Sequence, residues 1–99
     1  GGENIAPREI DEVLYGHPDV VEAAAFARPC AKYGERVEAA VSLRAGSNVD
    51  MRDLIALCQD RLGAFKTPDK IHFLSELPKG PSGKIQRLKL DELLTESIA

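Results

Sequence analysis

The chain has 99 residues, of which 43% are hydrophobic, so its length allows one compact domain with a core and leaves little for a second. Charged residues make up 29% and the formal net charge is −3, which excludes a generic attraction to nucleic acid or to an anionic membrane. No apolar stretch approaches the roughly 20 residues that a membrane-spanning helix needs, and no leader pattern opens the chain. We therefore expect one module without a nucleic-acid partner or membrane span, and a cytoplasmic location by default.

The first half of the chain predicts one helix and two strands. Residues 6–15 have apolar positions at helical spacing, and Pro7 suits the first turn of a helix. Residues 20–27 are mostly apolar and contain valine and phenylalanine, and residues 37–43 alternate apolar positions with others, so both segments predict strands. The segment between them, residues 28–35, is too long for a tight turn and predicts a surface loop.

The second half predicts a helix, a third strand and a last helix. Asp50 can cap a helix that Gly63 ends. Residues 71–74 then read as a short strand, and the crossover through a helix permits that strand to lie in the same sheet. The last helix carries its apolar side chains on one side: Leu90, Leu93, Leu94 and Ile98. The fold class is α+β, a small sheet of about three strands with helices packed on it, in the order helix, strand, strand, helix, strand, loop, helix.

Cysteines and histidines predict no metal site. Cys30 and Cys58 have no partner at metal-ligand spacing and are expected to be reduced, packing residues. His17 stands at a helix end and His72 in a strand, so a capping or half-exposed role is expected for both. No serine or cysteine lies in a recognisable signature for nucleophilic catalysis.

The loop over residues 77–85 is the most informative segment. Two prolines restrict its backbone, two glycines permit close approach or a positive φ, and Lys84 follows the second glycine directly. Such a loop can present an ammonium group to a phosphate. It is not a P-loop, because position 78 is proline where that motif needs glycine, and Ile85 follows Lys84 where it needs serine or threonine. The alternative is a solvent-facing connection whose lysine only aids solubility.

Residues 1–10 form a second segment of interest, a glycine pair that leads through an extended stretch into the first helix. Paired glycines lower the steric cost of placing a backbone beside a ligand chain. The alternative is an ordinary flexible turn. Because the chain starts at Gly1 without an initiator methionine, we expect it to be part of something longer.

Together these segments resemble the C-terminal domain of the adenylate-forming superfamily, which includes acyl-CoA synthetases, the adenylation domains of peptide synthetases, and luciferases. The resemblance covers essentially the whole chain and rests on five segments in the right order: residues 1–10, 17–18, 32–35, 65–68 and 77–85. It implies that residues 1–99 are the mobile lid domain of an AMP-forming acyl-CoA synthetase, whose large N-terminal ATP- and acyl-binding domain is absent from this chain.

The resemblance also implies roles for individual residues. Lys84 matches the catalytic lysine that serves adenylate formation. Its loop is supported by Gly80, Ser82 and Gly83. The pantetheine tunnel is lined by Gly1, Gly2, Glu3 and Asn4, with Asn4 near the acyl-adenylate. Candidate contacts to the CoA nucleotide phosphates are Lys66, Arg36, Arg87 and Lys89, although a solvated face is the preferred interpretation of all four.

The implied cofactors are ATP, AMP and CoA, with Mg²⁺ bound outside these residues. The implied partners are the N-terminal domain of the same enzyme, CoA, and a lysine acetyltransferase and deacetylase acting on Lys84, because acetylation would abolish its charge.

Two other functions remain as alternatives to a catalytic lid domain that is inactive on its own. One is a free-standing interaction module that acts in trans on a partner, and the other is an adenylation domain that serves a carrier protein. The intact Gly83 and Lys84 favour the catalytic lid, and residues 1–5 look more like acyl-CoA synthetases of fatty or small organic acids.

Overall fold

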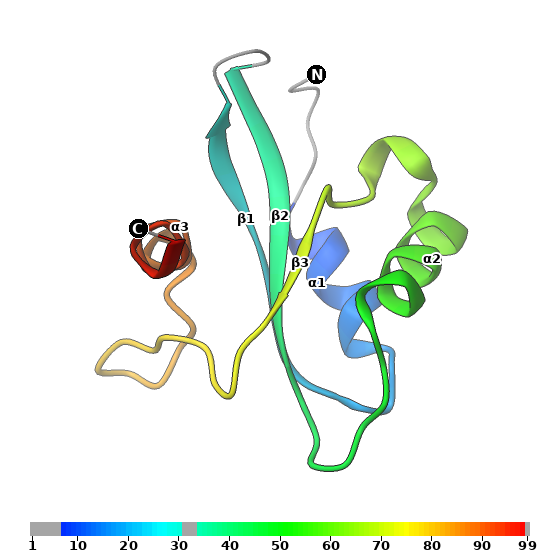
Figure 1. Ribbon diagram of the computed structural model, residues 1–99, viewed down its shortest axis with the longest axis horizontal. Helices are drawn as coiled ribbons and strands as arrows, with labels where there is room; N and C mark the ends of the chain where they lie inside the picture. Colours follow the sequence, from blue (N-terminus) through cyan, green and yellow to red (C-terminus); the bar gives the residue numbers. More distant parts are fainter. Residues whose placement is uncertain (1–6, 31–33, 99) are drawn as a thin grey trace.

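The structure is a computed structural model, and it describes residues 7–30 and 34–98 (Figure 1). Its elements follow in the predicted order: α1 (Pro7–Tyr15), β1 (Val20–Cys30), β2 (Gly34–Leu43), α2 (Met51–Leu62), a 3-10 turn η1 (Ala64–Lys66), β3 (Ile71–Phe73) and α3 (Arg87–Ile98). The predicted α+β class is confirmed. Among the described residues, no helix is long and apolar enough to cross a bilayer.

The sheet has three strands in the order β1-β2-β3. β1 and β2 are antiparallel, whereas β2 and β3 are parallel, with Ala39 opposite Ile71 and Val41 opposite Phe73. A parallel pair needs a long crossover, and α2 with η1 supplies it. The predicted placement of the third strand in the same sheet is therefore confirmed.

The prediction of a surface loop over residues 28–35 is wrong for most of that segment. β1 runs on to Cys30 and β2 already begins at Gly34, with Arg28 opposite Arg36. Strand pairing continues because each added pair satisfies backbone hydrogen bonds, and Pro29 is tolerated because β1 is an edge strand that needs no donor on its outer side. Residues 31–33 lie outside the described part of the chain.

Helices cover both faces of the sheet (Figure 1). α1 and α2 cover one face, and α3 together with the loop after β3 covers the other. The first face carries the larger apolar cluster: Ile10, Leu14, Val20, Ala23, Ala25, Ala39, Val41, Leu54, Cys58 and Ile71. The second carries a smaller one: Ala24, Phe26, Ala40, Leu77, Leu90 and Leu94. The two sets interleave along β1 because successive side chains of a strand point to opposite faces.

The ends of α2 follow the sequence closely. The Asp50 carboxylate accepts a hydrogen bond from the Asp53 N–H at 3.0 Å, and the Asp53 carboxylate accepts one from the Asp50 N–H at 3.1 Å. This is a reciprocal capping box, so the predicted N-cap is confirmed. Gly63 follows the helix with φ +85°, a conformation that favours glycine, which explains the predicted stop.

The predicted apolar side of the last helix is wrong at one position. Leu90 and Leu94 are buried, but Leu93 is 42% exposed. Leu90 and Leu94 are four residues apart and lie on one narrow stripe, which is all that the small second face accommodates. The side chain of Ile98 lies outside the described residues.

Candidate functional site

The loop between β3 and α3 is a small hairpin, and its sequence explains its shape. The Gly80 carbonyl accepts a hydrogen bond from the Gly83 N–H at 2.9 Å, and the Gly80 N–H donates to the Lys84 carbonyl at 2.9 Å. Gly83 has φ +84°. This is the pattern of a three-residue loop in which a type I turn is followed by a left-handed residue. Pro81 suits the second position of that turn, and glycine suits the left-handed position.

The strands of this hairpin are short but paired. Lys79 and Ile85 form an antiparallel bridge, and the Gln86 N–H donates to the Pro78 carbonyl at 2.8 Å. A side chain at Gly80 would meet the Gln86 amide, since an added Cβ would lie 2.5 Å from its Nε2 atom. Lys84 thus follows a turn whose backbone is fixed by hydrogen bonds on both sides.

One carboxylate of the sheet holds the base of the hairpin. Glu22 on β1 accepts hydrogen bonds from the Leu77 N–H and from the Ser42 hydroxyl, each at 3.1 Å, and forms an ion pair with Lys79. Leu77 itself is buried in the second core. Burial alone would raise the pKa of Glu22, but the bonds from Lys79, Leu77 and Ser42 outweigh it and hold that pKa below its ordinary value.

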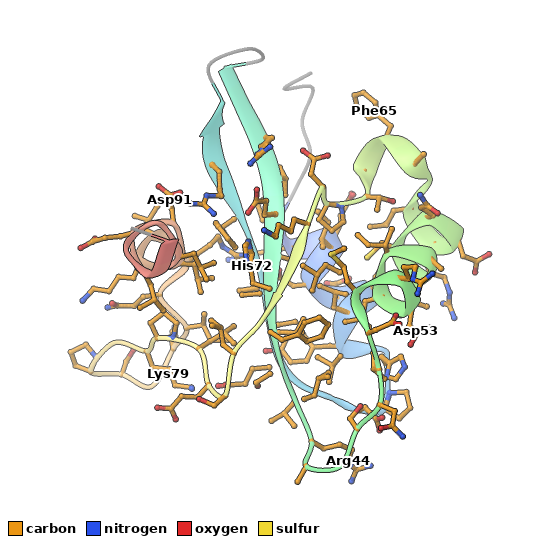
Figure 2. The ribbon with its side chains drawn as sticks, in the orientation of Figure 1. Arg44, Asp53, Phe65, His72, Lys79 and Asp91 are labelled. Carbon is orange, nitrogen blue, oxygen red and sulfur yellow. The ribbon has the colours of Figure 1, made fainter. Side chains whose placement is uncertain are left out.

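The two lysines of the loop differ in their surroundings. Lys79, labelled in Figure 2, pairs with Glu22 and donates to the Leu77 carbonyl at 3.1 Å. The Lys84 side chain is exposed, and within residues 7–30 and 34–98 it makes no hydrogen bond or ion pair. The loop therefore uses one ammonium group for its own attachment and leaves the other available to a ligand.

A buried cluster of charges lies on the same face of the sheet. The Glu38 side chain is 1% exposed and accepts from His72 at 2.6 Å, from Arg28 at 3.2 Å and from Arg36 at 3.1 Å. Arg28 also pairs with Asp91 of α3 at 2.9 Å (Figure 2 labels His72 and Asp91). Burial would raise the pKa of Glu38, but the bonds from His72 and Arg28 lower it below its ordinary value. Through Arg28, the cluster connects α3 to the strands of the sheet.

A second set of polar contacts connects the start of α3 to α1 and to the free edge of β1. The Arg87 guanidinium pairs with the Asp11 carboxylate at 2.9 Å and donates to the Ala25 carbonyl. Asp11 also accepts from the Ala25 N–H at 2.6 Å. The free edge of β1 is thereby satisfied at Ala25, and Arg87, which the resemblance assigned to CoA phosphates, is engaged within the domain.

The other basic residues assigned to CoA phosphates lie apart from one another. Lys66, at the end of η1, forms an ion pair with Glu9 of α1 at 3.1 Å and lines an open groove of about 460 Å³ between α1 and α2. Arg36 pairs with Glu38 on the opposite face. Lys89 is exposed on α3 and borders a pocket of about 130 Å³ beside Pro78. The structure does not gather these side chains into one cationic patch.

The remaining residues that the sequence singled out are glycines and polar residues at the start of the chain, the two histidines and a cysteine. Gly1, Gly2, Glu3 and Asn4 lie outside the described residues. His17 is partly exposed, as expected, and accepts a hydrogen bond from the Asp19 N–H at 3.0 Å in the turn after α1, whereas His72 is mostly buried against Glu38 rather than half-exposed. Cys58 is a free, buried thiol whose pKa burial raises to about 11, so its packing role is confirmed. In the described parts of the chain, no three His, Cys, Asp or Glu side chains come together as a potential metal site.

Sequence reasoning missed Glu22, Glu38, and the pair of Asp11 and Arg87. Each glutamate stands two residues before a buried alanine of the second core, Ala24 after Glu22 and Ala40 after Glu38. A carboxylate in such a position is costly to bury without partners. That signal could have marked both residues, although it would not have named their partners.

The fold and the hairpin define a class of domain: a three-stranded sheet, covered by helices on both faces, that displays an exposed lysine beside a turn shaped by proline and glycine. Residues 9–84 match the family described as AMP-binding enzyme C-terminal domain, and the chain belongs to this family.

Individual relatives agree with this assignment. The chain is 54% identical over 90 residues to a sulfoacetate–CoA ligase of Cupriavidus necator, covering 91% of this chain and 18% of that protein. It is 48% identical over 87 residues to an oxalate–CoA ligase of Arabidopsis thaliana, covering 88% of this chain and 17% of that protein. Its fold is similar to that of apo MatB from Rhodopseudomonas palustris, with TM-score 0.90 and 33% identity over 100% of this chain and 20% of that one. The chain thus spans about a fifth of these proteins.

Proposed function

We propose that this chain is the mobile C-terminal domain of an AMP-forming acid–CoA ligase, and that Lys84 is the residue with which it serves the formation of an acyl-adenylate. The observation that carries the proposal is the contrast within one hairpin, where Lys79 is bound by Glu22 and Lys84 is exposed and unpaired among the described residues. The names of the two relatives support the class of reaction, since both are CoA ligases.

The proposed chemistry follows from the charge of Lys84. In the first half-reaction the substrate carboxylate attacks the α-phosphorus of ATP, the bond to pyrophosphate breaks, and the acyl-adenylate forms. Negative charge gathers on the α-phosphoryl oxygens, the incoming oxygen and the leaving pyrophosphate. An ammonium group held on a fixed turn stabilises that charge without reorganising, and it also positions the reactants. In the second half-reaction the CoA thiol replaces AMP, and no developing phosphoryl charge requires Lys84.

We assign the remaining parts of the site by the same proposal. The ATP and acyl sites, with Mg²⁺, belong to a large N-terminal domain outside these residues. Gly1 to Asn4 line the passage for the pantetheine thiol, where glycine leaves room for a thin chain. Lys66 contacts the CoA nucleotide, and the solvent-exposed position of its pair with Glu9 supports this, because an exposed pair costs little to exchange. The 99-residue chain alone is expected to be inactive.

The full-length protein tests the proposed reaction. It is incubated with ATP, Mg²⁺ and a panel of carboxylic acids, beginning with sulfoacetate and oxalate, and pyrophosphate release is measured with and without CoA. We expect acid-dependent pyrophosphate release, and an acyl-CoA product by mass spectrometry when CoA is present.

Two other results would contradict the proposal. Transfer to a phosphopantetheinyl carrier protein but not to CoA would support an adenylation domain that serves a carrier. A complete reading frame that encodes no adenylating domain would instead support a module that acts in trans. Substrate-dependent pyrophosphate release by the 99-residue chain itself would overturn its expected inactivity.

We further propose that an acetyltransferase and a deacetylase control this domain through Lys84. The exposed position of the side chain supports the proposal, and acetylation would remove the charge on which adenylate formation depends. Incubation with an acetyltransferase and acetyl-CoA, followed by peptide mass spectrometry, tests it. We expect acetyl-Lys84, and an unmodified Lys84 would contradict the proposal.

A further inference from the structure

The hairpin that carries Lys84 is attached to the sheet at its base and not at its tip. Leu77 is buried in the second core, Ile85 packs against that core, and Lys79 forms an ion pair with Glu22. The turn residues beyond them, Pro81 to Lys84, are exposed. The direction in which the tip points is therefore set by the bonds at the base.

Glu22 occupies its place at that base because of an irregularity in β1. Val20 pairs with Leu43, but Glu22 pairs with Ser42, so the register shifts across Val21. An extra residue of this kind redirects the side chains that follow it. Val21 is left exposed, and Glu22 stands opposite Ser42 on the face where the hairpin lies.

The bonds of Glu22 join three separate parts of the chain. One carboxylate oxygen accepts from Ser42 of β2 and from the Leu77 N–H, and the other meets the Lys79 ammonium. Its side chain is 16% exposed. For packing alone, an apolar side chain would serve as well as a desolvated carboxylate. What a carboxylate adds is direction, because each hydrogen bond fixes the position of its donor.

The path from Glu22 to Lys84 is short. Lys79, which Glu22 binds, forms the bridge with Ile85, the residue that follows Lys84. Gly80, which follows Lys79, donates its N–H to the carbonyl of Lys84 at 2.9 Å. A displacement of Lys79 is therefore passed to the backbone of Lys84 through two backbone contacts.

We infer that Glu22 is a positioning residue for Lys84: it holds the base of the hairpin so that the ammonium group is presented in one place. This rests on the proposed function of Lys84. Reactions that depend on positioning lose rate steeply when a group is displaced by about 1 Å. Glu22 does not touch the reactants and acts only through the hairpin.

The test uses the full-length ligase with Glu22→Gln, Glu22→Ala and the double variant Glu22→Gln with Lys84→Ala. We expect adenylate formation to fall about tenfold with Gln and about 100-fold with Ala. Thioester formation from a supplied acyl-adenylate should stay within about twofold. In the Lys84→Ala background, Glu22→Gln should cause no further loss, because its effect passes through Lys84. Glu76→Gln is the matched control, since Glu76 is an exposed carboxylate beside the same loop.

Three results would overturn the inference: unchanged adenylation in Glu22→Ala, equal loss in both half-reactions, or an undiminished effect of Glu22→Gln when Lys84 is already alanine. Amide hydrogen exchange on the 99-residue chain gives an independent readout. The Leu77 N–H should lose protection in Glu22→Gln, while that of Ala40 in β2 keeps it. If Lys84→Ala alone leaves adenylation intact, the proposed function fails, and Leu77 exchange still reports whether Glu22 anchors the hairpin.

Discussion

The two faces of the sheet are built in different ways. Under α1 and α2, the buried residues form one apolar cluster that includes Ile10, Leu14 and Leu54. Under α3 and the hairpin, the apolar cluster is smaller, and carboxylates of the strands, Glu22 and Glu38, hold cationic partners. Hydrophobic burial is non-directional and scales with area, whereas a hydrogen bond fixes the position of its donor. The first face is thus suited to holding the domain together, and the second to placing the loop that carries Lys84.

Deleting buried volume on the apolar face should have the largest effect on stability. Leu54 is fully buried, so Leu54→Ala should lower the free energy of unfolding by about 2–5 kcal/mol. The matched control is Met51→Ala on the same helix, which should cost less than about 1 kcal/mol because Met51 is 40% exposed. Urea denaturation of the 99-residue chain measures both. Equal losses in the two variants would contradict the assignment of the main core to this face.

The contribution of the charged face to folding stability should decrease at low pH. The folded-state pKa values of Glu22 and Glu38 lie below the ordinary value of 4.5, so the unfolded chain binds more protons as the pH falls. Their stabilisation is present above about pH 4.5 and is lost as the pH falls through the lowered values. Glu38→Gln should lower stability at pH 7 by about 1–3 kcal/mol and flatten the decline in acid.

Chemical denaturation between pH 7 and pH 3 measures this difference, with Glu76→Gln as the exposed control. The explanation would be wrong if the curves of the native chain and Glu38→Gln stayed parallel throughout acidification.

The turn of the hairpin should give a smaller effect. An added Cβ at Gly83 meets nothing within 4 Å, but the residue has φ +84°, which L-residues disfavour. Gly83→Ala should therefore cost about 1–2 kcal/mol through backbone strain alone. Ser82→Ala, in the same exposed turn, should cost less than about 0.5 kcal/mol. Thermal unfolding of the two variants side by side checks the prediction, and indistinguishable midpoints would argue against a left-handed Gly83.

The sequence predicted the features of the fold that depend on interactions between residues close together in the chain. The cap at Asp50, the stop at Gly63 and the spacing of apolar residues in α1 and α2 are all properties of neighbouring residues. The extension of β1 to Cys30 and the start of β2 at Gly34 were not predicted, because strand length depends on the partner strand rather than on the residues themselves. Leu93 was misplaced because the width of the surface beneath α3 is a tertiary property.

The candidate site likewise combines features that neighbouring residues determine with features that depend on long-range contacts. Prolines and glycines in the sequence indicated a shaped loop before Lys84, and the turn of Gly80 to Gly83 explains that pattern. The partners of Glu22 and Arg87 could not be found, because those of Glu22 stand 20 to 57 positions away in the chain and Arg87 reaches an aspartate 76 positions away. Such pairings become visible only when the strands bring the segments together.

The role of Lys84 is the central claim, and the rate of acyl-adenylate formation in a single turnover of the full-length ligase tests it most directly. With Lys84→Ala, this rate should fall about 10²–10³-fold, while thioester formation from a supplied acyl-adenylate is retained. Lys70→Ala, which removes another exposed lysine, should leave the rate unchanged. Equal loss of both half-reactions in Lys84→Ala, or no loss of adenylate formation, would contradict the account.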